Sequence, residues 1–207
     1  MVINQSQNAA SEPACAPIRL LDPGQCNAVH AGVTRIAVVV HVVWNKARQN
    51  MSDAQIASQI NVLNRAYRRT QIDLNDAPAP FLPLAADVRI EFFLARVDPH
   101  GAASTGIERR QTSVASFCCD DAVKSQASGG AQAWPADRYL NIWVCQLDGD
   151  LPGYAQCPGG PAATDGVVIR HSAFGTIGTA ASPFHLGRTA TREIGRWLNL
   201  NHLWNID

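Results

Sequence analysis

The sequence lacks the features that mark a chain for a bilayer or for nucleic acid. It has no apolar run long enough to span a membrane, and its 17 Lys and Arg residues are balanced by 17 Asp and Glu residues. We therefore expect neither a membrane span nor a nucleic-acid partner. Methionine is also scarce, since Met1 and Met51 are its only occurrences.

Cysteine is too sparse for a fold built on disulfides. The chain has 6 cysteines in 207 residues, and they lack the paired C-x-x-C spacing of a structural zinc site. The disulfide pairing and the redox compartment therefore stay open. The residues concerned are Cys15, Cys26, Cys118, Cys119, Cys145 and Cys157.

The apolar content of 46% allows a substantial core, and the length favours one domain. Residues 1–33 mix polar residues with prolines and have no sustained periodicity, so we interpret them as an irregular N-terminal tail or a pro-segment remnant. This stretch has no basic start followed by an apolar segment, so no signal peptide is visible. We expect the folded domain to occupy residues 34–207.

One segment predicts a central strand. Residues Ile36 to Trp44 form a nearly unbroken β-branched run, which suits a strand covered on both faces. His41 lies inside this run. A single histidine in such a strand is more often a hydrogen-bonded core residue than a metal ligand, and we adopt that interpretation.

The next segment predicts a long helix from Asp53 to about Thr70. Ser52 and Gln55 stand at the spacing of a capping box, which favours a helix start at this point. Apolar residues then recur at helical spacing and define a buried face. They are Ile56, Ile60, Leu63 and Tyr67.

Alternating and β-branched segments predict three further strands, over 88–94, 139–147 and 166–170. We expect a loop over 98–110 and a short helix over 120–126 that is opened by Asp120. Strands separated by helices fit a twisted, mixed and mostly parallel sheet packed against helices, which is an α+β arrangement.

The last stretch, residues 191–207, carries an incomplete metal-site pattern. Zinc proteases place His-Glu-x-x-His on a helix because side chains four residues apart project side by side, and some add a third histidine six residues later. Glu193 and His202 stand at the glutamate and third-histidine positions, whereas Arg192 and Arg196 stand at the first two ligand positions.

This stretch resembles the active-site helix of the pappalysin family of metzincin zinc metalloendopeptidases, over Arg192 to Trp204. The resemblance extends over about residues 34–204 in the order of the family's segments. The other matching segments are Val38 to Val43, Leu63-Asn64, Phe92 to Ala95, Thr105 to Ile107, Tyr139 to Val144, and Gly153 to Gln156.

The resemblance implies the upper subdomain of a metzincin, with a backing helix and an active-site helix. It also implies zinc-dependent hydrolysis of peptide bonds in proteins, with Glu193 as general base, and it implies secretion. The family continues into a lower subdomain with a methionine-containing turn, whereas this sequence stops at Asp207. Some metzincins are held latent by a pro-segment cysteine, a role open to Cys15 or Cys26, although an ordinary cysteine is the simpler interpretation of each.

The two arginines change what the resemblance implies for zinc. A guanidinium stays protonated and offers only donors, so it cannot replace an imidazole lone pair. His202 is then the only retained ligand, and we expect no tightly bound zinc. Glu193 is then either a general base without a zinc-bound water to deprotonate, or a member of a salt-bridged cluster with Arg192 and Arg196.

Two smaller motifs accompany this helix. Asn199 stands where many metzincins have glycine, and asparagine is the residue that next best tolerates left-handed geometry. Gly153, Tyr154, Ala155 and Gln156 resemble the edge strand that pairs with extended substrate through backbone hydrogen bonds. An ordinary edge strand is the alternative.

Three interpretations of function remain open at this point. The chain is a pappalysin-like metalloendopeptidase that has lost zinc and activity, a non-catalytic module that binds a protein or peptide in its cleft, or a truncated and decayed copy. In the second case, Arg192 and Arg196 would attract carboxylates.

Overall fold

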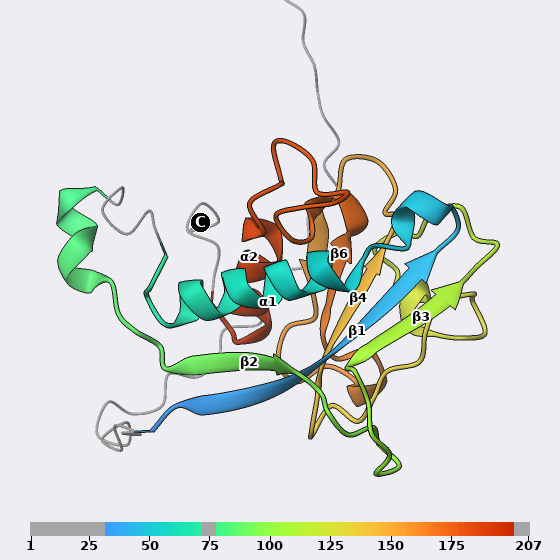
Figure 1. The fold of residues 1–207 in the computed structure, drawn as a ribbon, viewed down its shortest axis with the longest axis horizontal. Coiled ribbons are helices and arrows are strands. Elements are labelled where there is room, and N and C mark those ends of the chain that lie inside the picture. The colour runs from blue at the N-terminus through green and yellow to red at the C-terminus, as the bar shows by residue number, and fades with distance from the viewer. Residues whose placement is uncertain (1–31, 72–77, 201–207) are drawn as a thin grey trace, which may run out of the picture.

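The computed structural model describes residues 32–71 and 78–200. In Figure 1 these residues form one twisted sheet with helices α1 and α2 on the same face. Residues 1–31, 72–77 and 201–207 lie outside the described part of the chain, and so do the predictions that concern them. These are the tail interpretation for most of 1–33 and the roles considered for Cys15, Cys26 and His202.

The sheet has 6 strands in the order β2-β1-β4-β6-β5, and β3 also pairs with β1. All neighbours are parallel except β5, which runs antiparallel to β6 at one edge. The predicted mixed, mostly parallel sheet is therefore confirmed. The strands are β1 (Thr34–Trp44), β2 (Ile90–Leu94), β3 (Ile107–Gln111), β4 (Leu140–Cys145), β5 (Gly153–Ala155) and β6 (Val167–Arg170).

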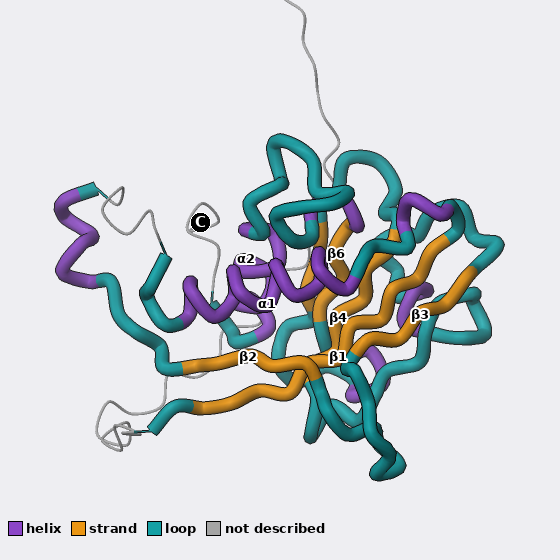
Figure 2. Tube along the Cα trace, in the orientation of Figure 1, coloured by secondary structure: helices purple, strands orange, loops and turns teal. Residues whose placement is uncertain are grey.

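Strand β1 is the centre of the sheet and is covered on both faces, as its β-branched run predicts. Val38, Val40 and Val42 are fully buried and belong to the main core with residues of both helices. Val39 and Val43 point to the opposite face, where loops cover the sheet and build two smaller clusters. Figure 2 shows these layers, with loops in teal beneath the orange strands.

Helix α1 (Asp53–Tyr67) begins where the sequence predicts and ends three residues earlier than Thr70. The Ser52 side chain caps it by accepting a hydrogen bond from the backbone N–H of Gln55 at 3.2 Å. Arg69 then adopts a left-handed conformation with φ 50°, which stops the helical path. The four predicted apolar positions are all buried: Ile56, Ile60, Leu63 and Tyr67.

Three of the smaller predictions require correction. The loop expected over 98–110 ends earlier, because Ile107–Gln111 pairs in parallel with the second half of β1. The strand expected from Val88 begins at Ile90, since Arg89 has φ 56° and Val88 is 54% exposed. The helix expected over 120–126 is only a 3₁₀ turn over Ala122–Lys124, because Asp121 before it has φ 63°.

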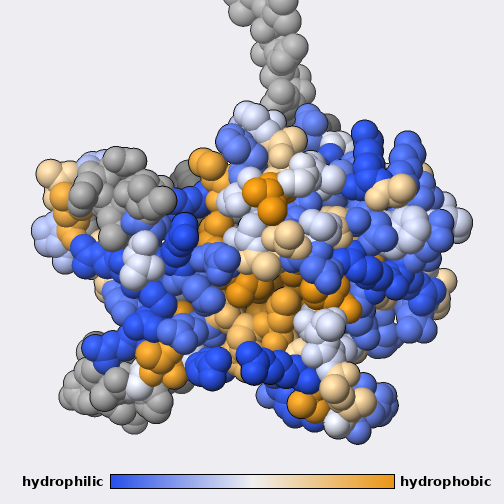
Figure 3. Space-filling view, in the orientation of Figure 1, coloured by the Kyte–Doolittle hydropathy of each residue, from blue (hydrophilic) through white to orange (hydrophobic). Residues whose placement is uncertain are grey.

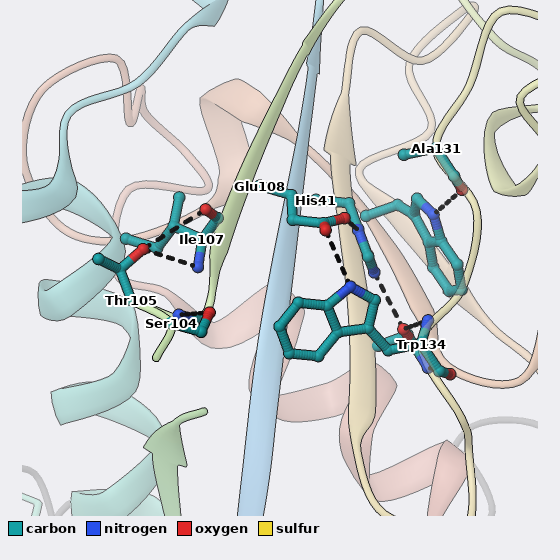
Figure 4. A network of polar contacts seen from close by, with 10 residues as sticks. His41, Ser104, Thr105, Ile107, Glu108, Ala131 and Trp134 are labelled. Atoms are coloured by element: carbon teal, nitrogen blue, oxygen red, sulfur yellow. Dashed lines mark hydrogen bonds and ion pairs between the residues drawn. The ribbon is translucent and has the colours of Figure 1, made fainter. Parts of the chain in front are cut away.

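His41 is a hydrogen-bonded core residue, as expected (Figure 4). Its ring is fully buried and stacks on Trp143 with the ring centroids 5.2 Å apart. Its Nδ1 lies 2.8 Å from Oε2 of Glu108, and its Nε2 lies 2.9 Å from Oδ1 of Asn141. The His41 hydrogen bond is the main reason that the pKa of Glu108 lies below its usual value.

Asn141 has a fixed orientation in this network. Its Oδ1 accepts the backbone N–H of Trp134 at 2.7 Å, and its Nδ2 donates to the Trp134 carbonyl at 2.9 Å. Exchanging the amide atoms would place donor against donor and acceptor against acceptor, so Nε2 of His41 must be the donor to Oδ1. The same Trp134 donates its Nε1–H to Glu108 at 2.9 Å and so closes the network.

Within the described residues, no helix is long and apolar enough to cross a membrane. Figure 3 shows hydrophilic residues over most of the visible face, with apolar residues gathered between α1 and strands β1 and β2.

Candidate active-site helix and edge strand

Helix α2 (Arg188–Trp197) carries the motif residues and lies against β5, β6 and α1. Its start is held by α1, because the Gln59 side chain donates to the Gly187 carbonyl at 3.0 Å. Gly187 has φ 69°, and a Cβ there would lie 3.1 Å from atoms of the Gln59 amide. Glycine is therefore the residue that fits this close approach.

The end of α2 follows the prediction for Asn199. This residue has φ 73°, and the N–H of Leu200 then reaches back to the Gly195 carbonyl at 2.9 Å. The pattern is a left-handed helix end of the kind that glycine or asparagine makes possible. Trp197 fixes the last turn by donating its Nε1–H to Asp165 at 3.1 Å.

The motif side chains of α2 are largely buried. Glu193 is 0% exposed and Arg196 is 6% exposed, on a helix whose Ile194 is also fully buried. Oε1 of Glu193 accepts from Nε of Arg192 at 2.7 Å and from its Nη2 at 2.5 Å. The salt-bridged alternative for Glu193 is thus present with Arg192.

The fourth motif residue, His202, lies outside the described residues. Among the residues that are described, no group of three or more His, Cys, Asp and Glu side chains is placed to hold a metal ion.

Strand β5 (Gly153–Ala155) forms the edge of the sheet beside the first turn of α2. Its register with β6 places Tyr154 opposite Val168. Gly153 is buried so tightly that a Cβ would meet the Val168 carbonyl oxygen at 2.8 Å and Cγ2 of Thr189 at 3.2 Å. The edge strand therefore packs directly on the candidate active-site helix.

The side chains of this segment do not point into open space. The Tyr154 ring is 7% exposed and lies 5.3 Å from the Lys124 ammonium. Gln156 is engaged within its own turn, donating to the Pro161 carbonyl at 3.0 Å and accepting from Thr164 at 2.6 Å. The segment can therefore offer a ligand mainly its backbone.

Two buried glutamines on α1 hold the loop that leads from β6 to α2; the sequence assigned Gln55 only to the capping box and predicted no role for Gln59. Gln55 donates to the Phe174 carbonyl at 2.8 Å and accepts the N–H of Thr179 at 3.0 Å. Gln59 accepts the N–H of Gly175 at 2.7 Å. The available signal was their spacing of four residues beside the apolar face of the helix.

Lys124 is a second missed residue. It is 2% exposed, pairs with Asp121 at 2.8 Å and donates to the Thr164 carbonyl at 2.7 Å. Burial lowers its pKa from the usual value. No local pattern in the sequence distinguishes it from a surface lysine.

Solved structures of mirolysin are among the known proteins that match this chain. No protein-family profile and no curated protein matches the chain. Mirolysin in complex with a compound is 51% identical, with a TM-score of 0.83 over 86% of this chain and 67% of the other. Mature mirolysin of Tannerella forsythia with a cleaved peptide is 50% identical, with the same TM-score and coverage.

A promirolysin mutant from the same organism is also 50% identical, with a TM-score of 0.83, and 59% of its chain is covered. Identity at this level over most of the chain shows common descent as well as a common fold. Together with the parallel sheet, the backing helix α1 and the helix α2 beside an edge strand, these matches place the chain in the mirolysin family of metzincin-type metalloproteases.

Proposed function

We propose that this chain is a pappalysin-type zinc metalloendopeptidase by descent whose hydrolysis of peptide bonds is impaired by Arg192 and Arg196. The observation that carries the proposal is the fully buried Glu193 in contact with the Arg192 guanidinium. A general base must accept a proton from water in the site. A carboxylate oxygen already bound by a guanidinium is a poor acceptor for that proton.

The residues at the family's ligand positions do not fit zinc. Zinc is implied by the family, and catalytic sites hold it with three protein ligands that offer lone pairs. Arg192 and Arg196 offer only N–H donors, and their positive charges repel a dication. His202 is a single candidate ligand, so we propose that the chain holds no zinc tightly.

A protein or peptide remains the proposed partner of the cleft. Gly153, Tyr154, Ala155 and Gln156 are proposed to bind an extended peptide through the outer backbone groups of β5. The antiparallel edge position of β5 and the buried Tyr154 support a backbone role. Mature mirolysin with a cleaved peptide supports the same class of ligand.

The alternative function is a non-catalytic peptide-binding module, and the third interpretation is a decayed copy without a selected function. The intact packing of α2 and β5 favours a retained cleft, because a decayed copy has no reason to keep both elements buried against each other. In a peptide-binding module, Arg192 and Arg196 would supply positive charge complementary to a peptide carboxylate.

Secretion is proposed on the family relationship and on the disulfide bond of Cys157, since disulfides persist in oxidising compartments.

The division into a tail over 1–33 and an upper metzincin subdomain over 34–207 is likewise a proposal. The strands β1 to β6 and the helices α1 and α2, all within residues 34–200, support the proposed subdomain.

A quenched-peptide assay combined with a peptide-binding screen tests the proposed function. The chain is expected to hydrolyse no peptide above the rate of its own Glu193→Ala variant. Binding of extended peptides that is weakened by Ala155→Pro, which removes one backbone donor from β5, would favour the binding module. Hydrolysis that disappears in Glu193→Ala would overturn the proposed loss of activity.

A further inference from the structure

Cys118 and Cys119 are adjacent, exposed and free, and they lie outside the candidate active-site helix and edge strand. Their sulfur atoms are 3.8 Å apart, so each thiol already lies in contact with the other. The remaining described cysteines differ from this pair. Cys145 is buried, which raises the pKa of its thiol and makes it inert, and Cys157 is disulfide-bonded.

The chain is anchored on both sides of the pair. On the N-terminal side, Phe117 is 4% exposed and pairs with Leu147 in a parallel bridge. Its N–H donates to the Gln146 carbonyl at 2.9 Å, and its carbonyl accepts the N–H of Asp148 at 2.9 Å. The residue before the pair is therefore fixed to the core.

On the C-terminal side, Asp120 accepts the N–H of Ala122 at 3.1 Å. Asp121 holds the buried Lys124 ammonium at 2.8 Å. The two thiols therefore stand on a short exposed segment between fixed ends. Such anchoring keeps the two sulfur atoms close together.

We propose that Cys118 and Cys119 form a reversible thiol–disulfide modification site, which small-molecule disulfides oxidise to a bond between the two neighbouring residues. One thiolate attacks a sulfur of oxidised glutathione and releases one glutathione thiolate. The second cysteine thiolate then attacks the protein sulfur of the mixed disulfide and releases the other. Both thiols lose their protons to solvent, and the glutathione disulfide takes up the two electrons.

The bond is reversible for a geometric reason. Adjacent Cα atoms lie about 3.8 Å apart across a trans peptide, whereas ordinary disulfides join Cα atoms about 4.4–6.8 Å apart. A bond between neighbours is therefore strained, and strained, exposed disulfides are the ones that reductants open first. The pair should respond to thiol–disulfide couples that leave the disulfide of Cys157 intact.

Intact mass and alkylation of the full chain test this proposal. The chain is equilibrated with glutathione buffers of graded redox ratio, quenched in acid and alkylated. We expect the oxidised form to lose two hydrogens in mass and to lose alkylation at both residues together. A trivalent arsenical, phenylarsine oxide, should add once to the reduced chain and block both residues, because arsenic binds two neighbouring thiols.

The single variants Cys118→Ser and Cys119→Ser distinguish the bond from simple modification. Each should acquire one glutathione adduct in place of the intramolecular bond and lose stoichiometric arsenical binding. The buried-thiol control Cys145→Ser should behave as the parent. A disulfide-linked dimer, a glutathione adduct on each residue of the parent, or full alkylation at every redox ratio would overturn the proposal.

Discussion

Replacing Asn141 with leucine removes the centre of the buried network beneath β1. The side chain is fully buried and makes hydrogen bonds to the backbone N–H of Trp134, to its carbonyl and to His41. Leucine has a similar volume but leaves these three groups without partners. At about 1–3 kcal/mol for each buried group, the expected loss is about 3–9 kcal/mol.

That loss is large compared with a typical total stability of about 5–15 kcal/mol. Urea unfolding followed by tryptophan fluorescence measures it, and with a slope of about 2 kcal/mol per molar the midpoint should fall by about 1.5–4.5 M. Asn61→Leu on the exposed face of α1 is the matched control and should shift stability by no more than about 0.5 kcal/mol. Equal midpoints for the two variants would refute the importance of the network.

The remaining predictions concern pH and packing. Burial lowers the pKa of His171 from 6.5 to about 4, so the unfolded chain binds the extra proton first and stability should fall as pH drops from 6.5 toward 4. His171→Gln should flatten that slope in thermal melts, whereas the exposed His185→Gln should leave it unchanged. The pKa of Glu108 is lowered, so its contribution to the stability of the fold is present above about pH 4.5 and is lost as the pH falls further. Glu108→Gln should remove this acid-dependent part of the stability. Leu63→Ala should cost about 2–5 kcal/mol by leaving a cavity under α1, and the half-buried Val62→Ala should cost less than half as much in the same urea assay.

The elements predicted from the sequence are those whose signals are local. The β-branched run of β1 requires cover on both faces, and Ser52 with the apolar spacing that follows specifies α1. Asn199 was identified because few residues adopt left-handed geometry at a helix end. The contact between Glu193 and Arg192 follows from their proximity on one helix.

The elements missed depend on partners far away in the chain. Ile107–Gln111 is rich in charge and becomes a strand because the long β1 extends beyond β2 and offers it an edge. Gln55 looks like a surface residue until its amide meets the Phe174 carbonyl, 119 residues later. Such hydrogen bonds leave no periodic signal in the sequence.

Replacing Arg192 and Arg196 with histidine tests whether the motif residues lie where the family relationship implies. If Arg192, Arg196 and His202 stand where the family relationship implies, Arg192→His with Arg196→His should give measurable zinc affinity in isothermal titration. Any peptide hydrolysis that this variant shows should depend on Glu193 as the general base. Glu193→Ala in the repaired chain should therefore abolish it.

The zinc content of the purified, dialysed chain tests the central claim most directly. Elemental analysis should find no stoichiometric zinc in the parent, because two guanidiniums stand at the positions where the family has imidazoles. The Arg192→His and Arg196→His double variant, measured in parallel, should retain zinc. One tightly held zinc per parent chain that is lost in His202→Ala would contradict the proposed loss of the metal site.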